Sequence, residues 1–95
     1  MSEVIDQAVA ALKQKLPDGF SSTAKFVIKD EGSIIVDESG VRPGDDEAEV
    51  VLTADRETFE GMLNGDVNPT SAFMSGKLSV DGSMGLAMQL GAALA

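Results

Sequence analysis

Residues 68–90 have the sequence NPTSAFMSGKLSVDGSMGLAMQL, and this stretch carries the strongest structural signals of the chain. Asn68 and Pro69 predict a short helix over Pro69–Ser75, because Asn caps helices well and Pro suits the first helical position. The alternation of apolar and polar residues that follows predicts a strand over Lys77–Asp81. A short helix leading directly into a strand is therefore expected here.

The segment after that strand is unusual because residues 83–95 contain no charged side chain. Ser83 is a plausible N-cap, and the apolar positions of the helix that follows go all the way round it. We expect such a helix to be covered on every side. It is too short to span a bilayer, which takes about 20 residues, so core, ligand or partner must cover it. Its apolar residues are Met84, Leu86, Ala87, Met88, Leu90, Ala93 and Leu94.

Upstream, the apolar residues recur with the period of two that is typical of half-buried strands. Ala24, Phe26 and Ile28 point one way in the first strand, and Ser33–Asp37 forms a second one. Residues 38–46 are a polar connection, and Glu47–Thr53 alternates again, with Val50 and Leu52 inward. Three consecutive short strands joined by turns predict an antiparallel meander.

Two further helices complete the order of elements. The first runs from about Ser2 to Leu16, with Ser2 as a plausible N-cap, and is amphipathic. The second is capped by Thr53 or Asp55 and stopped by Gly65, with Phe59, Met62 and Leu63 on one face. The order predicts an α+β fold: a mainly antiparallel sheet of about four to five strands, covered on one face by helices. Residues 1–95 are expected to form a single domain.

Composition excludes several classes of chemistry. The chain has 16 acidic against 7 basic residues, a net charge of -9, and neither His nor Cys. Cys/His zinc sites and Ser-His-Asp or Cys-His catalysis are therefore excluded. The acidic balance disfavours nucleic acid, because binding to phosphate backbones depends on clustered Lys and Arg. No signal peptide is visible at the N-terminus, so a cytoplasmic protein is predicted.

Three motif fragments fail their chemical requirements. Gly76-Lys77 lacks the remaining glycine and hydroxyl of a phosphate loop. Gly82-Ser83-Met84-Gly85 lacks the first glycine of a nucleophile elbow and has no His to activate the serine. The acidic run Asp45–Glu49 lacks calcium-loop spacing and is expected to be a solvated turn. No metal site, cofactor or catalytic residue is predicted.

The methionines and phenylalanines of the C-terminal half are the remaining candidates. Methionine adapts to apolar partners of variable shape, although an ordinary core containing Met explains the same residues equally well. Those on the predicted helices are Phe59, Met62, Phe73, Met74, Met84 and Met88.

The motifs in Ala72–Leu78 and Gly82–Met88, preceded by Leu52–Asp55, resemble those of the sterol carrier protein family of non-specific lipid-transfer proteins. Ala93-Leu94-Ala95 is not a peroxisomal targeting tripeptide, and in this the chain resembles the free-standing bacterial members. The resemblance implies an α+β fold that encloses an apolar tunnel for acyl chains or sterols, and no catalysis. The family commonly has an aromatic residue in its second strand, where this chain has Ile34–Val36. The chain is also short, so a smaller tunnel is expected.

The chain is accordingly predicted to be a lipid-binding module that carries or presents acyl chains, sterol-like or other apolar molecules. Transient membrane contact and a monomeric state fit this interpretation. The alternative is a protein interaction domain that docks through its apolar C-terminal helix, without lipid. The predicted lipid-binding residues are Phe26, Val50, Leu52, Phe59, Met62, Phe73, Met74, Met84, Leu86, Met88 and Leu90.

Overall fold

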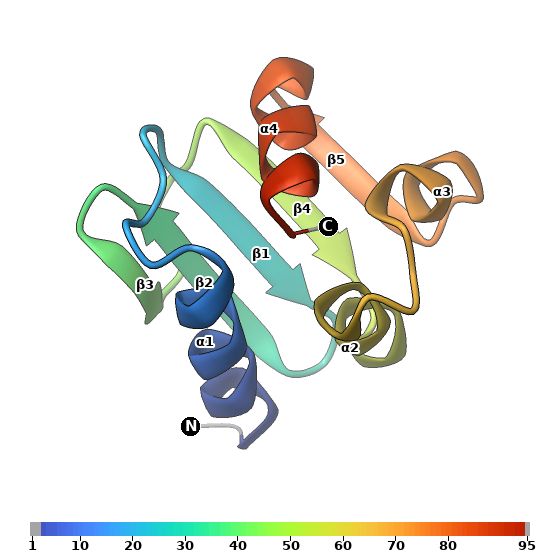
Figure 1. Ribbon diagram of the computed structural model, residues 1–95, viewed down its shortest axis with the longest axis horizontal. Helices are drawn as coiled ribbons and strands as arrows, with labels where there is room; N and C mark the ends of the chain where they lie inside the picture. The colour runs from blue at the N-terminus through green and yellow to red at the C-terminus, as the bar shows by residue number, and fades with distance from the viewer. Residues whose placement is uncertain (1–2, 95) are drawn as a thin grey trace.

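The computed structural model describes residues 3–94. It contains four helices and five strands (Figure 1). In chain order these are α1 (Glu3–Lys15), β1 (Ala24–Ile28), β2 (Gly32–Asp37), β3 (Gly40–Pro43), β4 (Val50–Ala54), α2 (Arg56–Asn64), α3 (Pro69–Met74), β5 (Leu78–Gly82) and α4 (Met84–Leu94).

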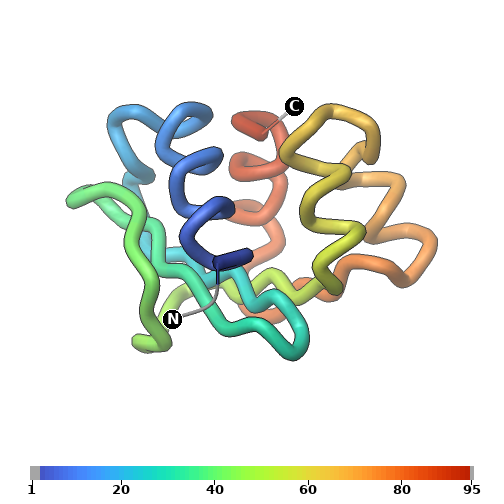
Figure 2. The backbone as a smooth tube through the Cα atoms, turned by 90° about the horizontal axis from the view of Figure 1, so that it is seen from below, coloured from blue at the N-terminus to red at the C-terminus, as the bar shows by residue number. Residues whose placement is uncertain are grey.

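The five strands form one sheet in the order β3-β2-β1-β4-β5. Three of its four pairings are antiparallel, and β1 pairs with β4 in parallel. Figure 2 shows all four helices on one side of this sheet. The predicted α+β fold, with a mainly antiparallel sheet covered on one face, is confirmed.

The face of the sheet beneath the helices is apolar, as the alternation predicts. Ala24, Phe26 and Ile28 are buried on β1, and Val50 and Leu52 are buried on β4. Lys25 and Val27 lie between them in the chain and are only partly buried. The period of two therefore assigned the inward residues of both strands correctly.

The predicted antiparallel meander is wrong in two respects. Residues 38–46 are not only a connection, because Gly40–Pro43 forms the edge strand β3 against β2. Its four residues and its terminal proline give a weak strand signal, although proline is tolerated on an edge. The third predicted strand does not continue the meander either: Val50–Ala54 skips β2 and β3 and runs parallel to β1, with Val50 beside Ala24, and its antiparallel partner is β5.

The parallel pairing requires the chain to cross from one side of β1 to the other between β3 and β4. On this path Gly44 lies against the fully buried Ile35, whose side chain an added Cβ at Gly44 would meet at 3.2 Å. Asp45, the next residue on this path, forms an ion pair with Lys25 on β1, whose ammonium lies 3.0 Å from the Asp45 carboxylate. The Ser33 hydroxyl also donates to the Gly44 carbonyl at 2.6 Å. The crossover therefore covers part of the sheet face opposite the helices.

Side-chain caps fix where the later helices begin. Asp55, and not Thr53, caps α2, since its carboxylate accepts the Thr58 N–H at 2.7 Å. The Asn68 side chain accepts the N–H groups of Thr70 and Ser71 ahead of α3. The Ser83 hydroxyl accepts the Leu86 N–H at 3.3 Å, as expected of a cap. The expected cap at Ser2 lies outside the described residues.

The cap at Asp55 gives the fold a pH dependence of defined sign. The Thr58 backbone N–H lowers the pKa of the Asp55 carboxyl below its ordinary value of 3.8. A carboxyl with a depressed folded-state pKa stabilises the fold fully above pH 3.8, and this stabilisation is lost as pH falls through the folded pKa. Asn caps about as well as Asp but does not titrate.

We therefore expect the free energy of unfolding of the wild type, relative to an Asp55→Asn variant, to stay constant from neutral pH down to about 3.8 and to fall below it. Urea unfolding of both proteins across this pH range measures the difference. If the free energies of unfolding of the two proteins keep a constant difference into acid, the Asp55 charge contributes nothing to the cap.

Candidate functional site

An apolar groove of about 550 Å³ lies between the sheet and the C-terminal helices. Its floor comes from β1, β4 and β5, and its walls come from α2, α3, α4 and the residues just before α3. In Figure 1, β4, β5, α3 and α4 lie on the side of the molecule opposite β3. The groove is lined by Phe26, Leu52, Met62, Asn68, Pro69, Thr70, Phe73, Met74, Leu78, Val80, Met84, Ala87, Met88, Gly91, Ala92 and Leu94.

The floor of the groove is a row of side chains on neighbouring strands. The register of the strands aligns these side chains across the sheet. Phe26 on β1 is the register partner of Leu52 on β4, and Leu52 is the partner of Val80 on β5. Register partners point to the same face, so the three apolar side chains form a continuous strip. The floor therefore depends on the parallel β1–β4 pairing as much as on the identity of its residues.

The walls approach each other closely at one point. A Cβ added at Gly91 on α4 would lie 3.6 Å from the Cβ of Pro69, the first residue of α3. The spacing of Met84, Ala87, Met88 and Gly91 along α4 is three to four residues, so they form one stripe facing the groove. The small residues Ala87 and Gly91 leave space in the groove between the larger side chains of Met84 and Met88.

The rim of the groove is exposed. Met74 is 81% exposed, Met88 73%, Met84 46% and Phe73 40%. The protein's own residues cover α4 on one side, where Ala87, Leu90 and Leu94 are buried, while Met84 and Met88 reach solvent. The expectation that core, ligand or partner covers the whole helix therefore stays a prediction for the exposed side. The helix is apolar all round because one side packs on the sheet and another borders the groove.

No charged side chain lines the groove within residues 3–94. Its polar side chains are those of Asn68 and Thr70, and the Asn68 oxygen is already engaged in capping α3. The same range holds no cluster of three or more acidic, His or Cys side chains that could hold a metal ion. The groove can therefore accept an apolar molecule, but it offers no titratable group for proton transfer.

The carboxylates with perturbed pKa values beyond Asp55 belong to structural contacts elsewhere. The Arg42 guanidinium, hydrogen-bonded at 2.9 Å, lowers the pKa of Asp37. The Lys25 ammonium lowers the pKa of Asp45 in the crossover. Neither carboxylate lines the groove. Both pKa shifts come from ion pairs in the β2–β3 region and the crossover.

The structure brings seven of the eleven sequence-predicted site residues together in the groove. Of the other four, Val50 and Leu90 are fully buried core residues, Phe59 lines a different cavity, and Leu86 is partly buried against the core. The seven in the groove are Phe26, Leu52, Met62, Phe73, Met74, Met84 and Met88.

Sequence analysis missed the small residues of the lining. Gly91 and Ala92 continue the stripe of Met84 and Met88 along α4, so helical spacing could have indicated them. Leu78 and Val80 lie on the strand predicted over Lys77–Asp81 but were not assigned to the site. Their assignment needed the position of β5 next to β4.

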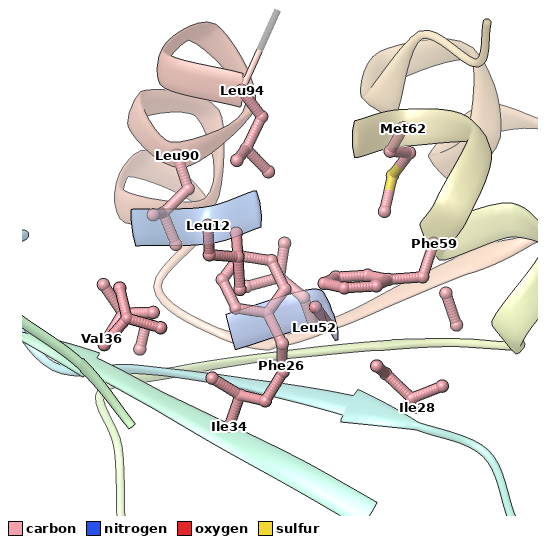
Figure 3. Close-up of a cluster of buried hydrophobic side chains, with 14 of the residues drawn as sticks. Leu12, Phe26, Ile28, Ile34, Val36, Leu52, Phe59, Met62, Leu90 and Leu94 are labelled. Carbon is pink, nitrogen blue, oxygen red and sulfur yellow. The ribbon is translucent and has the colours of Figure 1, made fainter. Parts of the chain in front are cut away.

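A second hollow, which we call the crevice, lies between α1 and α2 and has both apolar and polar residues in its lining. It measures about 240 Å³ and is lined by Val4, Gln7, Ala8, Ala11, Phe59, Glu60, Leu63 and Asn64. The Phe59 ring reaches from its wall toward Phe26, and the two ring centroids are 5.5 Å apart with the planes tilted by 60° (Figure 3). The crevice and the groove thus meet at this pair of rings.

The chain belongs to the SCP-2 sterol transfer family, whose model matches residues 3–95. Within residues 3–94, no helix is long and apolar enough to cross a membrane.

Curated relatives are much longer proteins. The chain is 35% identical over 91 residues to hydroxysteroid dehydrogenase-like protein 2 of Bos taurus, a match that covers 95% of this chain and 21% of that protein. It is 41% identical over 61 residues to peroxisomal multifunctional enzyme A of Dictyostelium discoideum, covering 64% of this chain and 13% of the other. The chain spans between about a tenth and a fifth of the length of these relatives.

Solved structures share the fold. Sterol carrier protein 2 of Aedes aegypti, in complex with the fatty acid palmitate, superposes with a TM-score of 0.80 at 22% identity and covers 100% of this chain and 97% of that one. The apo form of sterol carrier protein 2 from Yarrowia lipolytica gives a TM-score of 0.70 at 23% identity, covering 95% and 75% of the two chains. At these identities the likeness shows the fold.

Proposed function

We propose that residues 1–95 form one lipid-binding domain that holds an acyl chain, a sterol-like molecule or a similar apolar lipid in the groove, without catalysing a reaction. The observation that carries the proposal is the lining itself, in which sheet residues and exposed methionines surround about 550 Å³ of uncharged space. Methionine tolerates partners of different shape, so broad specificity is expected. Membership of the SCP-2 sterol transfer family and the palmitate complex of the Aedes aegypti protein support it.

The energetics of such a site favour moderate affinity. Burial of each methylene contributes about 0.8 kcal/mol, so a long acyl chain gains roughly 10 kcal/mol before the costs of ordering and association. Micromolar dissociation constants are therefore expected. Because no charged group of residues 3–94 lines the groove, a polar headgroup is expected to stay in water at its rim.

The alternative function is docking of a partner protein on the same rim, which the exposure of Met74 and Met88 also favours. The presence or absence of a co-purified lipid distinguishes lipid binding from partner docking. We expect native mass spectrometry of the protein from cells to show a lipid-sized mass increment, and organic extraction to release an acyl or sterol-like molecule. Protein that carries no lipid and takes up none from added fatty acid would favour the partner-docking function.

Met88→Lys tests the groove directly. Met88 is 73% exposed, so the lysine ammonium can reach water and the free energy of unfolding should change by no more than about 0.5 kcal/mol. A bound chain would desolvate the new charge, so affinity for an uncharged long-chain alcohol should fall at least about tenfold.

Gln89→Lys is the matched control for this variant, because Gln89 is the next residue on α4, is exposed, and is absent from the groove lining. Displacement of a fluorescent probe measures affinity, and urea unfolding measures stability. Unchanged binding by Met88→Lys, or equal loss in both variants, would refute the placement of lipid beside Met88.

The rim also suits contact with a membrane surface of low charge. Helices α3 and α4 contain no charged residue, while the whole chain carries a net charge of -9. The apolar rim can meet an uncharged lipid surface, whereas the remaining surface is repelled by anionic lipid.

We expect flotation at low salt to recover more protein with zwitterionic than with strongly anionic vesicles. Added salt should raise recovery with anionic vesicles, because exposed charges are screened beyond about 8–10 Å near physiological salt. Met74→Ser should lower recovery with both. Stronger binding to anionic vesicles at low salt would contradict this membrane contact.

A further inference from the structure

The groove and the crevice are separated by little more than one pair of aromatic rings. Phe26 lines the groove and Phe59 lines the crevice, and their ring centroids are 5.5 Å apart. Figure 3 shows the Phe59 side chain extending from α2 toward Phe26. Both phenylalanines are almost fully buried, so neither ring is free to leave the contact.

Helix α2 presents neighbouring side chains to the two cavities. Met62 lines the groove, whereas Phe59, three residues earlier, and Leu63, four residues after Phe59, line the crevice. On the far side of the crevice α1 contributes Ala8 and Ala11, whose short side chains leave the space unfilled. Removing the Phe59 ring would therefore join the crevice to the groove.

The Phe59 ring is a firm wall for this partition. Phe59 lies in the first turn of α2, where its N–H donates to the carbonyl of the capping residue Asp55 at 3.0 Å. Phenylalanine has few rotatable bonds, and its ring packs against Phe26, whereas Met62 beside it has a flexible side chain. An incoming chain can displace Met62 more easily than the paired rings.

We propose that the Phe26–Phe59 pair is the end wall of the lipid site and sets the longest acyl chain that the groove can bury. This inference rests on the proposed lipid-binding function. Phe59 is then a specificity-determining residue although it lines the crevice rather than the groove. The methyl end of a bound chain stops at the rings, and a longer chain leaves its surplus methylenes at the exposed rim.

The end wall predicts a break in the dependence of affinity on chain length. Each methylene that enters the groove should tighten binding by up to about fourfold, which is 0.8 kcal/mol expressed as a ratio. Methylenes added beyond the wall should add almost nothing. In a variant without the ring, affinity should continue to rise over several further methylenes, because the crevice becomes available to the chain.

The experiment measures affinities of saturated fatty acids, from octanoate to eicosanoate, for the wild type, Phe59→Ala and Phe59→Leu. Phe59→Leu keeps an apolar side chain and serves if the alanine variant does not fold. Leu16→Ala is the control for loosened packing, because Leu16 is a buried core residue that lines neither cavity. In the Phe59→Leu background, Ala11→Leu should refill the crevice and restore the wild-type break.

A break that moves to longer chains in the Phe59 variants, stays in place in Leu16→Ala and returns with Ala11→Leu supports the end wall. A break at the same length in every protein, or a wild-type affinity that rises without a break, overturns it while leaving lipid binding intact. Failure of the wild type to bind any fatty acid of the series would instead refute the proposed function.

Discussion

The parallel pairing of β1 with β4 is the constraint on which the other features depend. It makes β1 the central strand, bonded to β2 on one side and β4 on the other. Because α2, α3, β5 and α4 all follow β4 in the chain, this pairing sets their position relative to β1. It also aligns Phe26, Leu52 and Val80 into one apolar strip, and the groove has no floor without that alignment.

The buried core extends beyond the residues that line the groove. Leu12 on α1 and Ile34 and Val36 on β2 are fully buried, and none of them lines the groove. A 95-residue chain buries a smaller fraction of its surface than a larger domain, so an open apolar groove is a costly feature. Burial of core residues under α1 contributes stability that does not depend on the groove, while Met74 and Met88 on the β5 side stay exposed to solvent.

The absence of charge from the groove lining carries as much meaning as its apolar residues. With 16 acidic residues in the chain, an uncharged lining over residues 3–94 requires that the acidic side chains lie elsewhere. Asp37 and Asp45 are engaged with Arg42 and Lys25 in the β2–β3 region and the crossover. The groove lining is thus an uncharged part of a molecule that is otherwise strongly acidic.

Local chemistry in the sequence was enough to predict the helix starts at Asn68 and Ser83 and to narrow the cap of α2 to Thr53 or Asp55, because a cap acts over three residues and needs no distant partner. It also predicted the buried face of β1 from the alternation of its residues. The order of elements predicted the fold class, which the family resemblance of residues 72–88 also implied, and the positions of the methionines on predicted helices singled out those that line the groove.

Tertiary structure alone decided the pairing of β4 with β1 and the burial of individual α4 residues. Strand partners far apart in sequence are chosen by the path of the crossover, which alternation does not encode. Leu90 and Met88 are both apolar and two residues apart, yet Leu90 is buried on the sheet and Met88 borders the groove. Periodicity groups residues onto helix faces, but what covers each face depends on neighbouring elements that fold from other parts of the chain.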